Sequence, residues 1–319
     1  MGVAGFTNTW QLLGIVNFFE PGKEMAQKIT GIFAPIPTPF VNEEIAYDKL
    51  KENLAWWGST DLAGVVVMGS NGEFVYLSER EKEELIGFVR ENFNPKKKVI
   101  AGTGFESTRE TIRLTKRAAE LGADAALIVT PHYYKGSMTN EALKKYYFDV
   151  ADASPIPVLL YNMPNNTGLN MPARLVIELS SHPNIAGIKD SSGNIVQISE
   201  IIAGVRPDFA VFAGSASFLL TSLMMGAVGG TLATANILPN QCVAVQRLFE
   251  AGRLEEARQL QLKLLPINAA VTSRWGVAGL KAAMDLLGHF GGEPRRPTLP
   301  LKDQEREELK RLLAEFGAI

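Results

Sequence analysis

The chain has 319 residues, 46% of them hydrophobic and 21% charged, a size that suits two average domains or one α/β barrel. Its 32 basic and 34 acidic residues give a net charge of −2, which excludes the basic surface that binds nucleic acid or an anionic membrane. Cys242 is the only cysteine, and the three histidines lack the spacing of a metal site. We therefore expect a cytoplasmic protein that uses no metal and no cofactor.

The amino-terminal residues do not match a signal peptide or a membrane span. Residues 10–19 are apolar, but no Lys or Arg precedes them, and ten residues are too few to cross a bilayer. A more ordinary segment begins at Met25. We expect residues 1–24 to be an extension or a misassigned start, residues 25–250 to form the catalytic domain, and residues 251–319 to form helices packed on that domain.

From residue 29 onward, a short apolar run, a turn and an amphipathic stretch alternate. Runs of this length that are rich in Val, Ile, Leu and Ala are typical of strands buried on both faces of a parallel sheet. The predicted strands are residues 30–37, 64–69, 98–102, 125–130, 157–162, 185–189, 209–213 and 227–233. Residues 78–92 are predicted to form a helix capped by Ser78 with Glu81 three residues later, and residues 107–121 a helix that ends at Gly122.

Eight such units in roughly 220 residues match a (β/α)₈ TIM barrel. A doubly wound open sheet could carry the same alternation, but no Gly-x-Gly-x-x-Gly follows the first predicted strand. Three further helices are predicted at residues 254–270, 276–287 and 303–316. The predicted fold is therefore α/β, a (β/α)₈ TIM barrel with additional carboxyl-terminal helices.

Functional groups of a parallel barrel gather at the carboxyl ends of its strands. Three predicted strands end in polar segments: Gly69-Ser70-Asn71-Gly72-Glu73, Tyr161-Asn162-Met163-Pro164-Asn165-Asn166-Thr167-Gly168, and Gly187-Ile188-Lys189-Asp190-Ser191-Ser192-Gly193. The serine, asparagine and glycine of the first segment offer a hydroxyl, an amide and backbone N–H groups, which suit a carboxylate. Gly214-Ser215 and Gly229-Gly230 could cradle a phosphate or form tight turns with positive φ.

Lys189 is the strongest catalytic candidate. It follows an apolar run, and burial disfavours the ammonium form of lysine, leaving an amine that can attack a carbonyl. Gly187, two residues earlier, would leave space for a ligand. The structural alternative is a lysine that extends from a strand end or pairs with Asp190.

Tyr161 is the second candidate, because a phenol at a barrel mouth can pass a proton to and from a substrate oxygen. A phenol is a poor base at neutral pH, so it would need a relay of hydroxyls, for which Ser70 and Tyr133 are candidates. The structural alternative is a core tyrosine whose hydroxyl only makes a hydrogen bond within the protein.

Together, these segments resemble the dihydrodipicolinate synthase/N-acetylneuraminate lyase family of class I aldolases, from about residue 29 to the carboxyl end. The similar segments are Gly69–Glu73 (the family's Gly-Thr-Thr-Gly-Glu loop), Thr130-Pro131-His132-Tyr133-Tyr134 (its Thr-Pro-Tyr-Tyr segment), Tyr161–Pro164 with Thr167-Gly168 (its tyrosine motif) and Gly187–Ser191 (its Schiff-base strand). The resemblance implies a (β/α)₈ barrel with carboxyl-terminal helices, commonly a homotetramer.

The resemblance also implies roles for four catalytic residues. Lys189 would form an imine with a 2-oxo acid such as pyruvate, and Tyr161 would shuttle protons. Ser70 would stand in the proton relay, and Tyr133 would match the relay tyrosine that a neighbouring subunit contributes. The implied substrate-binding residues are Asn71 (with Ser70, on the oxo-acid carboxylate), Thr231 (facing pyruvate through its backbone), Gly214 (in the pocket wall), Ser191 and Asn166.

Two departures bear on the substrate. Asn166 stands where the synthases usually have an Arg that grips a substrate carboxylate, and Ser70-Asn71 replaces Thr-Thr; asparagine cannot form a bidentate charged pair. Both features are more similar to 4-hydroxy-2-oxoglutarate aldolases. The leading hypothesis is a pyruvate-releasing aldolase that acts on a 4-hydroxy-2-oxo acid. The alternatives are a synthase that condenses pyruvate with aspartate semialdehyde, an inactive 2-oxo-acid-binding barrel, and a phosphate-binding barrel enzyme that uses Gly229-Gly230.

Overall fold

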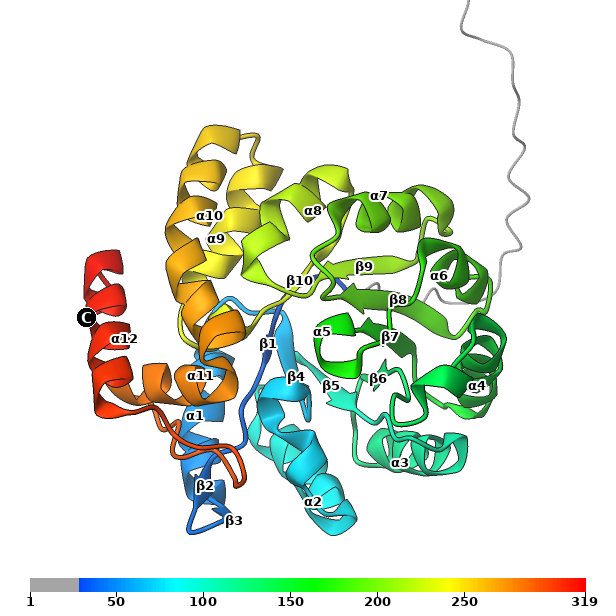
Figure 1. The fold of residues 1–319 in the computed structure, drawn as a ribbon, viewed down its shortest axis with the longest axis horizontal. Helices are drawn as coiled ribbons and strands as arrows, with labels where there is room; N and C mark the ends of the chain where they lie inside the picture. Colours follow the sequence, from blue (N-terminus) through cyan, green and yellow to red (C-terminus); the bar gives the residue numbers. More distant parts are fainter. Residues whose placement is uncertain (1–28) are drawn as a thin grey trace, which may run out of the picture.

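The computed structural model describes residues 29–319, so the predicted extension over residues 1–24 lies outside the described residues. Eight parallel strands close into a barrel in the order β1-β10-β9-β8-β7-β6-β5-β4. The barrel closes because β1 pairs with both β10 and β4, and helices surround it (Figure 1). The predicted (β/α)₈ TIM barrel is confirmed, and the open sheet is excluded.

The barrel strands fall within the predicted runs, apart from Asp190, which extends β8 by one residue. They are β1 (Gly31–Pro35), β4 (Gly64–Val67), β5 (Lys98–Gly102), β6 (Ala125–Val129), β7 (Val158–Asn162), β8 (Ile185–Asp190), β9 (Ala210–Ala213) and β10 (Gly229–Thr231). An antiparallel pair that was not predicted, β2 (Phe40–Val41) and β3 (Glu44–Ile45), follows β1. Asn42 and Glu43 turn between these two strands with φ of 51° and 70°.

The helices around the barrel are α1 (Tyr47–Ser59), α2 (Glu79–Asn92), α3 (Thr108–Glu120), α4 (Asn140–Ala153), α6 (Ala173–Leu179), α7 (Ile195–Gly204), α8 (Leu219–Met225) and α9 (Pro239–Glu250), and α5 (Pro164–Thr167) is a single turn after β7. The predicted capping box of α2 is confirmed, since the Ser78 side chain accepts from the Glu81 N–H and the Glu81 side chain accepts from the Ser78 N–H. Gly122 follows α3 with a φ of 86°, as its predicted role requires.

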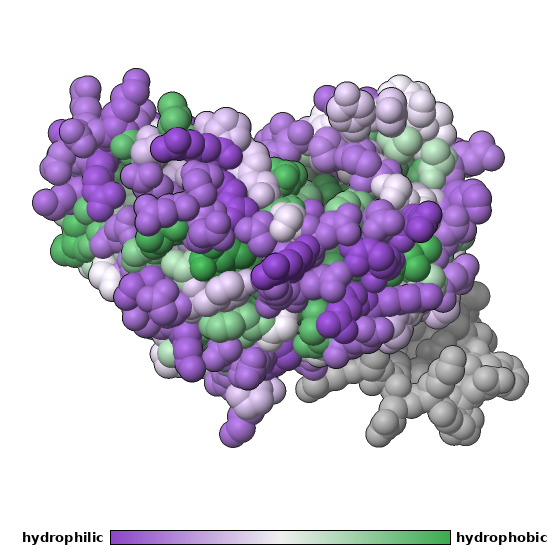
Figure 2. All heavy atoms as spheres, turned by 90° about the horizontal axis from the view of Figure 1, so that it is seen from below, coloured by the Kyte–Doolittle hydropathy of each residue, from purple (hydrophilic) through white to green (hydrophobic). Residues whose placement is uncertain are grey.

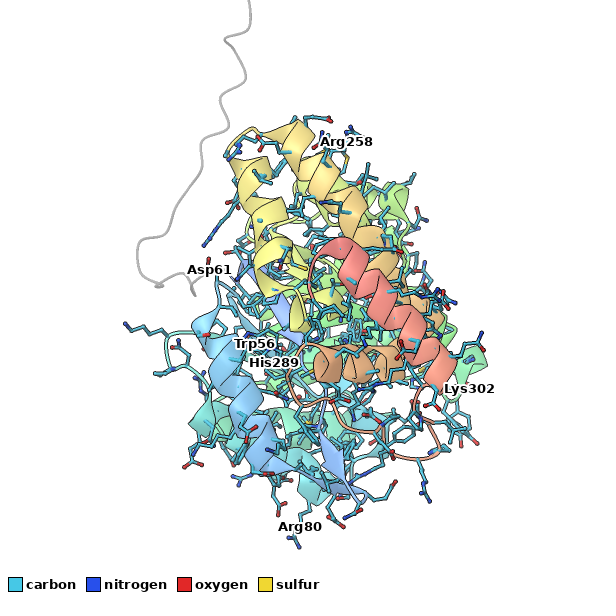
Figure 3. The ribbon with its side chains drawn as sticks, turned by 90° about the vertical axis from the view of Figure 1, so that its left-hand side faces the viewer. Trp56, Asp61, Arg80, Arg258, His289 and Lys302 are labelled. Carbon is cyan, nitrogen blue, oxygen red and sulfur yellow. The ribbon has the colours of Figure 1, made fainter. Side chains whose placement is uncertain are left out.

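Three further helices, α10 (Leu254–Ala269), α11 (Gly276–Leu286) and α12 (Asp303–Phe316), begin at the predicted residues. They lie beside α9 and α1 on one side of the barrel (Figure 1). After α11, the His289 ring stacks on Trp56 of α1 with their centroids 3.5 Å apart (Figure 3). The segment beyond the barrel therefore returns to pack on it. In the described part of the chain, no helix has both the length and the apolar character needed to cross a bilayer.

The barrel interior is apolar, whereas hydrophilic residues predominate on the outer face seen in Figure 2. One buried cluster fills the interior: Phe33, Val66, Ile100, Ala125, Leu127, Leu159, Tyr161, Ala210 and Phe212. The rings of Phe33 and Phe212 meet edge to face, with centroids 5.9 Å apart. Apolar side chains therefore fill the barrel below the carboxyl ends of its strands.

Gly229 and Gly230 are paired residues of β10, within the predicted strand 227–233, and do not form the tight turn or phosphate cradle considered for them. Gly229 lies opposite Gly31 of β1, and a Cβ on Gly229 would lie 2.0 Å from the Gly31 carbonyl oxygen. Close approach of the first and last strands explains Gly229, whereas a Cβ on Gly230 would meet the side chains of Leu232 and Leu219. The phosphate cradle therefore loses its structural basis.

Candidate active site

Lys189 lies on β8, with its side chain inside the barrel. It is in register with Tyr161 of β7 and Phe212 of β9, both members of the interior cluster, and neighbouring parallel residues in register point to the same face. Only 4% of Lys189 is exposed, and its Nζ lies 4.3 Å from the centroid of the Tyr161 ring. Within residues 29–319, this nitrogen has no hydrogen-bond or ion-pair partner.

Asp190 does not pair with Lys189, which removes the ion pair from the structural alternatives for that lysine. Successive residues of a strand point to opposite faces, so Asp190 lies outside the barrel. Its carboxylate accepts from Asn162 Nδ2 (2.8 Å), Gln197 Nε2 (3.2 Å), and the Ser192 N–H (2.8 Å) and Oγ (2.5 Å). These bonds tie β7, β8 and the start of α7 together behind the site.

Tyr161 and Ser70 meet at the end of the barrel. Tyr161 is buried, with 4% exposed, and its hydroxyl lies 3.2 Å from Ser70 Oγ, so that either group can donate. Ser70 opens the 3₁₀ turn Ser70–Gly72 that follows β4. A contact between these two hydroxyls is what the predicted relay requires.

Two non-glycine residues with positive φ bracket this turn: Met68 at 59° and Glu73 at 55°. Left-handed backbone is uncommon outside glycine and persists where the surroundings hold it. Lys281 of α11 supplies such a hold, since its Nζ lies 2.5 Å from Glu73 Oε1 and the two side chains are 0% and 2% exposed. The Arg295 N–H donates to Glu73 Oε2 at 2.8 Å, and Lys281 Nζ donates to the Glu293 carbonyl at 3.0 Å.

Sequence reasoning missed the buried pair of Glu73 and Lys281. Desolvation raises the pKa of Glu73 and lowers that of Lys281, and the opposite charge of each partner counters both shifts. The available signal was a lysine within the apolar run from Val277 to Met284. This pair connects the turn that carries Ser70 to the carboxyl-terminal helices.

Asn71, the next residue in the turn, faces the end of β1. Its Nδ2 donates to the Pro35 carbonyl at 3.3 Å, which also accepts from Asn236 Nδ2 at 2.9 Å. The Gly72 carbonyl accepts from Thr38 Oγ1 at 2.7 Å. The turn is therefore fixed to the β1 side of the mouth as well as to α11.

Ser191 and Gly214 are in contact beside Lys189. The Gly214 N–H donates to the Asp190 carbonyl at 2.7 Å, and a Cβ on Gly214 would lie 2.0 Å from Ser191 Oγ. Ser191 Oγ is buried and has no hydrogen-bond partner among the described residues. Thr231 ends β10 and is also buried. Ser191 and Gly214 thus lie across the mouth from Ser70, and Thr231 lies on β10, between them and β1.

Gly187 does not leave space for a ligand, so that prediction is wrong. A Cβ on Gly187 would lie 2.3 Å from the Ala210 carbonyl oxygen of β9. The glycine instead permits close packing of two barrel strands.

Tyr133 and Asn166 lie at the rim, apart from the buried group. Tyr133 is 76% exposed, its ring centroid is 5.0 Å from that of Tyr134, and its N–H donates to Glu106 Oε2 at 2.9 Å. Asn166 is exposed in the single turn α5. Neither has a hydrogen bond to Lys189, Tyr161 or Ser70 within residues 29–319.

An amine and a hydroxyl pair in an apolar pocket suit imine formation followed by proton transfer. A small cavity adjoins the phenol; its lining is Met68, Gly69, Phe74, Gly102, Gly104, Leu127, Val129 and Tyr161. Elsewhere, burial raises the pKa of the Cys242 thiol to about 12, which disfavours a thiolate nucleophile. In residues 29–319, no cluster of three or more His, Cys, Asp and Glu side chains could hold a metal ion.

Comparison with known proteins gives one family along the whole described chain. The model of the dihydrodipicolinate synthetase family matches residues 28–316. A protein of Emericella nidulans named probable 4-hydroxy-2-oxoglutarate aldolase, mitochondrial, is 37% identical over 293 residues, or 90% of this chain and 94% of that protein. A 4-hydroxy-tetrahydrodipicolinate synthase of Geotalea uraniireducens is 38% identical over 289 residues, or 91% and 99% of the two chains.

Comparison with solved structures gives the same family. A dihydrodipicolinate synthase superposes with a TM-score of 0.86 at 32% identity, covering 91% of this chain and all of that one. A prophage protein of E. coli K12 in the same family, solved in complex with pyruvate, has a TM-score of 0.86 at 28% identity and covers 91% of this chain and 99% of its own. The names of these relatives thus give two activities, an aldolase and a synthase.

Proposed function

The chain belongs to the dihydrodipicolinate synthetase family, whose members are class I lyases, and from this premise we propose that it is a Schiff-base aldolase that cleaves or forms a 4-hydroxy-2-oxo acid such as 4-hydroxy-2-oxoglutarate. One observation carries the proposal. Lys189 lies buried and unpaired against Tyr161, whose hydroxyl contacts Ser70 at 3.2 Å. A nucleophile for C2 and a proton-transfer pair for the 4-hydroxyl would thereby act on the same bound substrate.

In cleavage, Lys189 Nζ adds to the C2 carbonyl, and loss of water gives a protonated imine. Tyr161 removes the proton from the 4-hydroxyl and is coupled to Ser70 for onward transfer. The C3–C4 electron pair moves into the imine, so an aldehyde such as glyoxylate leaves and an enamine remains. Protonation at C3 and addition of water release pyruvate and the free amine. The imine supplies the electron sink on which the bond cleavage depends.

The binding residues follow the same arrangement. Ser70 and Asn71 hold the carboxylate next to C2, Ser191 lies across the mouth after β8, and the backbone of Thr231 on β10 faces pyruvate. Ser191 Oγ is a buried hydroxyl without a partner in the described chain, and such a group favours a polar ligand. Gly214 allows Ser191 to pack closely against that wall, because any Cβ there would collide with Ser191 Oγ.

The proposed role of Tyr133 depends on the assembly of subunits into an oligomer. Its side chain is largely exposed and could extend the relay in a neighbouring subunit of a homotetramer. Cross-linking and light scattering test this arrangement: a fully active monomer would exclude it. We also propose a cytoplasmic location, and cell fractionation with an antibody would distinguish this from the mitochondrial location in the name of the Emericella nidulans relative.

The decisive experiment is borohydride reduction in the presence of pyruvate, followed by peptide mass mapping. We expect a pyruvyl adduct on Lys189, no adduct in Lys189→Met, and full labelling of Lys116→Met, which alters an exposed lysine of α3. Labelling elsewhere, or near-parent cleavage by Lys189→Met, refutes the mechanism. An adduct without turnover of any aldehyde would instead favour the inactive 2-oxo-acid-binding barrel.

The second candidate is the synthase, which several relatives carry in their names. Asn166, in place of an arginine that would grip a carboxylate, favours the aldolase. Coupled assays with glyoxylate and with aspartate semialdehyde separate the two. We expect kcat/KM to be higher with glyoxylate, and the reverse order would assign the synthase.

A further inference from the structure

The loops at the mouth of the barrel carry very little positive charge. They follow the eight barrel strands and comprise residues 36–46, 68–78, 103–107, 130–139, 163–172, 191–194, 214–218 and 232–238. Lys135 is the only Lys or Arg in all of these segments. Any anionic group that a substrate presents at the mouth therefore meets one cation on these loops.

Lys135 is folded over the loop that follows Tyr161. A Cβ on Gly168 would lie 2.7 Å from Lys135 Nζ, 3.1 Å from its Cε and 3.5 Å from its Cδ. Gly168 ends the turn α5 with a φ of 66°, and β6 and β7 are neighbours through Val129 and Tyr161. The ammonium thus reaches from the β6 loop across to the β7 loop.

This ammonium is free of partners among the described residues. The nearby acid Glu106 is engaged, since it accepts from the His132 and Tyr133 N–H groups and lies 3.0 Å from the His132 ring. Arg295, from the carboxyl-terminal segment, also reaches the mouth loops, but its guanidinium is bound to Glu81 and to the Glu43 and Tyr76 carbonyls.

The proposed substrate carries a second carboxylate, on C4. That carbon bears the hydroxyl that Tyr161 deprotonates, so the carboxylate and this hydroxyl are attached to the same carbon. Tyr161 lies on β7, directly before the loop that Lys135 covers. We propose that Lys135 binds this C4 carboxylate and thereby selects 4-hydroxy-2-oxo dicarboxylic acids. The inference rests on the proposed aldolase function and names the group that supplies the charge missing at Asn166. An ammonium gives a point contact here, without the bidentate geometry of arginine.

The test compares cleavage of 4-hydroxy-2-oxoglutarate with cleavage of 4-hydroxy-2-oxopentanoate, in which a methyl group replaces the C4 carboxylate. We expect Lys135→Met to lower the ratio of kcat/KM for the dicarboxylate to that for the methyl analogue by about tenfold, mainly through KM, as expected for a lost charge-assisted contact. Lys135→Arg should retain most of the ratio, Lys135→Glu should lower it further, and Lys116→Met should not change it.

An unchanged ratio in Lys135→Met, or an equal loss with both substrates, overturns the assignment of Lys135. Borohydride trapping of pyruvate on Lys189 is measured on the same variants and keeps the two claims apart. Trapping with an unchanged ratio rejects this inference alone, whereas absence of trapping in the parent enzyme rejects the proposed function.

Discussion

Replacing Lys281 by Met tests how the turn that carries Ser70 is held. The change removes the ammonium and leaves the Glu73 carboxylate, 2% exposed, with the Arg295 N–H as its remaining donor. Removing one partner of a buried ion pair costs about 3–5 kcal/mol, because the other charge stays buried without compensation. We expect Lys281→Met to lower the free energy of unfolding by that amount.

The double variant Glu73→Gln/Lys281→Met tests whether the uncompensated charge of Glu73 causes this loss of stability. Glutamine keeps an oxygen for the Arg295 N–H but leaves no buried charge, so most of the lost stability should return, to within about 1–2 kcal/mol of the parent. Urea unfolding of the parent, both single variants and the double variant gives the coupling energy. A double variant no more stable than Lys281→Met would refute the interpretation.

The pH dependence gives an independent check. Burial raises the pKa of Glu73, and removing the neighbouring ammonium raises it further in Lys281→Met. For a carboxyl whose folded pKa is raised, stability is present below the unfolded value of 4.5 and is lost as pH rises through the folded value. The deficit of Lys281→Met relative to the parent should therefore be smaller at about pH 5 than at about pH 8, and a constant deficit contradicts this cause.

Two further substitutions test the loss of stability at acid pH and the proton relay. The hydrogen bond from Arg295 is the main cause that lowers the pKa of Glu81 to about 2, so its stabilisation is present above the ordinary value of 4.5 and lost as pH falls toward 2. Urea unfolding should show Glu81→Gln about 1–2 kcal/mol less stable than the parent at neutral pH and equal to it near pH 2, and a pH-independent gap contradicts this. Tyr161→Phe keeps the ring beside Lys189 but removes the hydroxyl that contacts Ser70, so turnover should fall about 10²–10⁴-fold while borohydride trapping of pyruvate persists. Loss of trapping in proportion to turnover would show that the hydroxyl is needed for imine formation itself, which contradicts a role confined to the later proton transfer.

The strands and several helices could be predicted because their signals are local. Strands buried on both faces are continuous apolar runs, and the Ser78–Glu81 capping box marks the start of α2 within four residues of sequence. Lys189 and Tyr161 could be singled out because each interrupts such a run at a strand end. Their register on adjacent strands follows from the barrel itself.

The errors came from contacts between distant segments. Gly187 and Gly229 carry no sequence signal that distinguishes space for a ligand from close approach of a neighbouring strand, and at both positions a strand takes the space. The pairing of Glu73 with Lys281 likewise depends on where α11 packs. The orientation of Asp190 away from Lys189 was accessible, since strand alternation alone requires it.

The barrel and the carboxyl-terminal helices contribute to different parts of the proposed chemistry. Backbone pairing of β7 and β8 places Lys189 against Tyr161, so imine formation depends on the barrel. Ser70 lies on a turn bracketed by positive φ at both ends, and such a turn needs external support, which Lys281 of α11 supplies through Glu73. Substitutions in α11 that leave the chain folded should therefore slow proton transfer more than pyruvate trapping, and equal effects on both steps would contradict a supporting role of α11 for this turn.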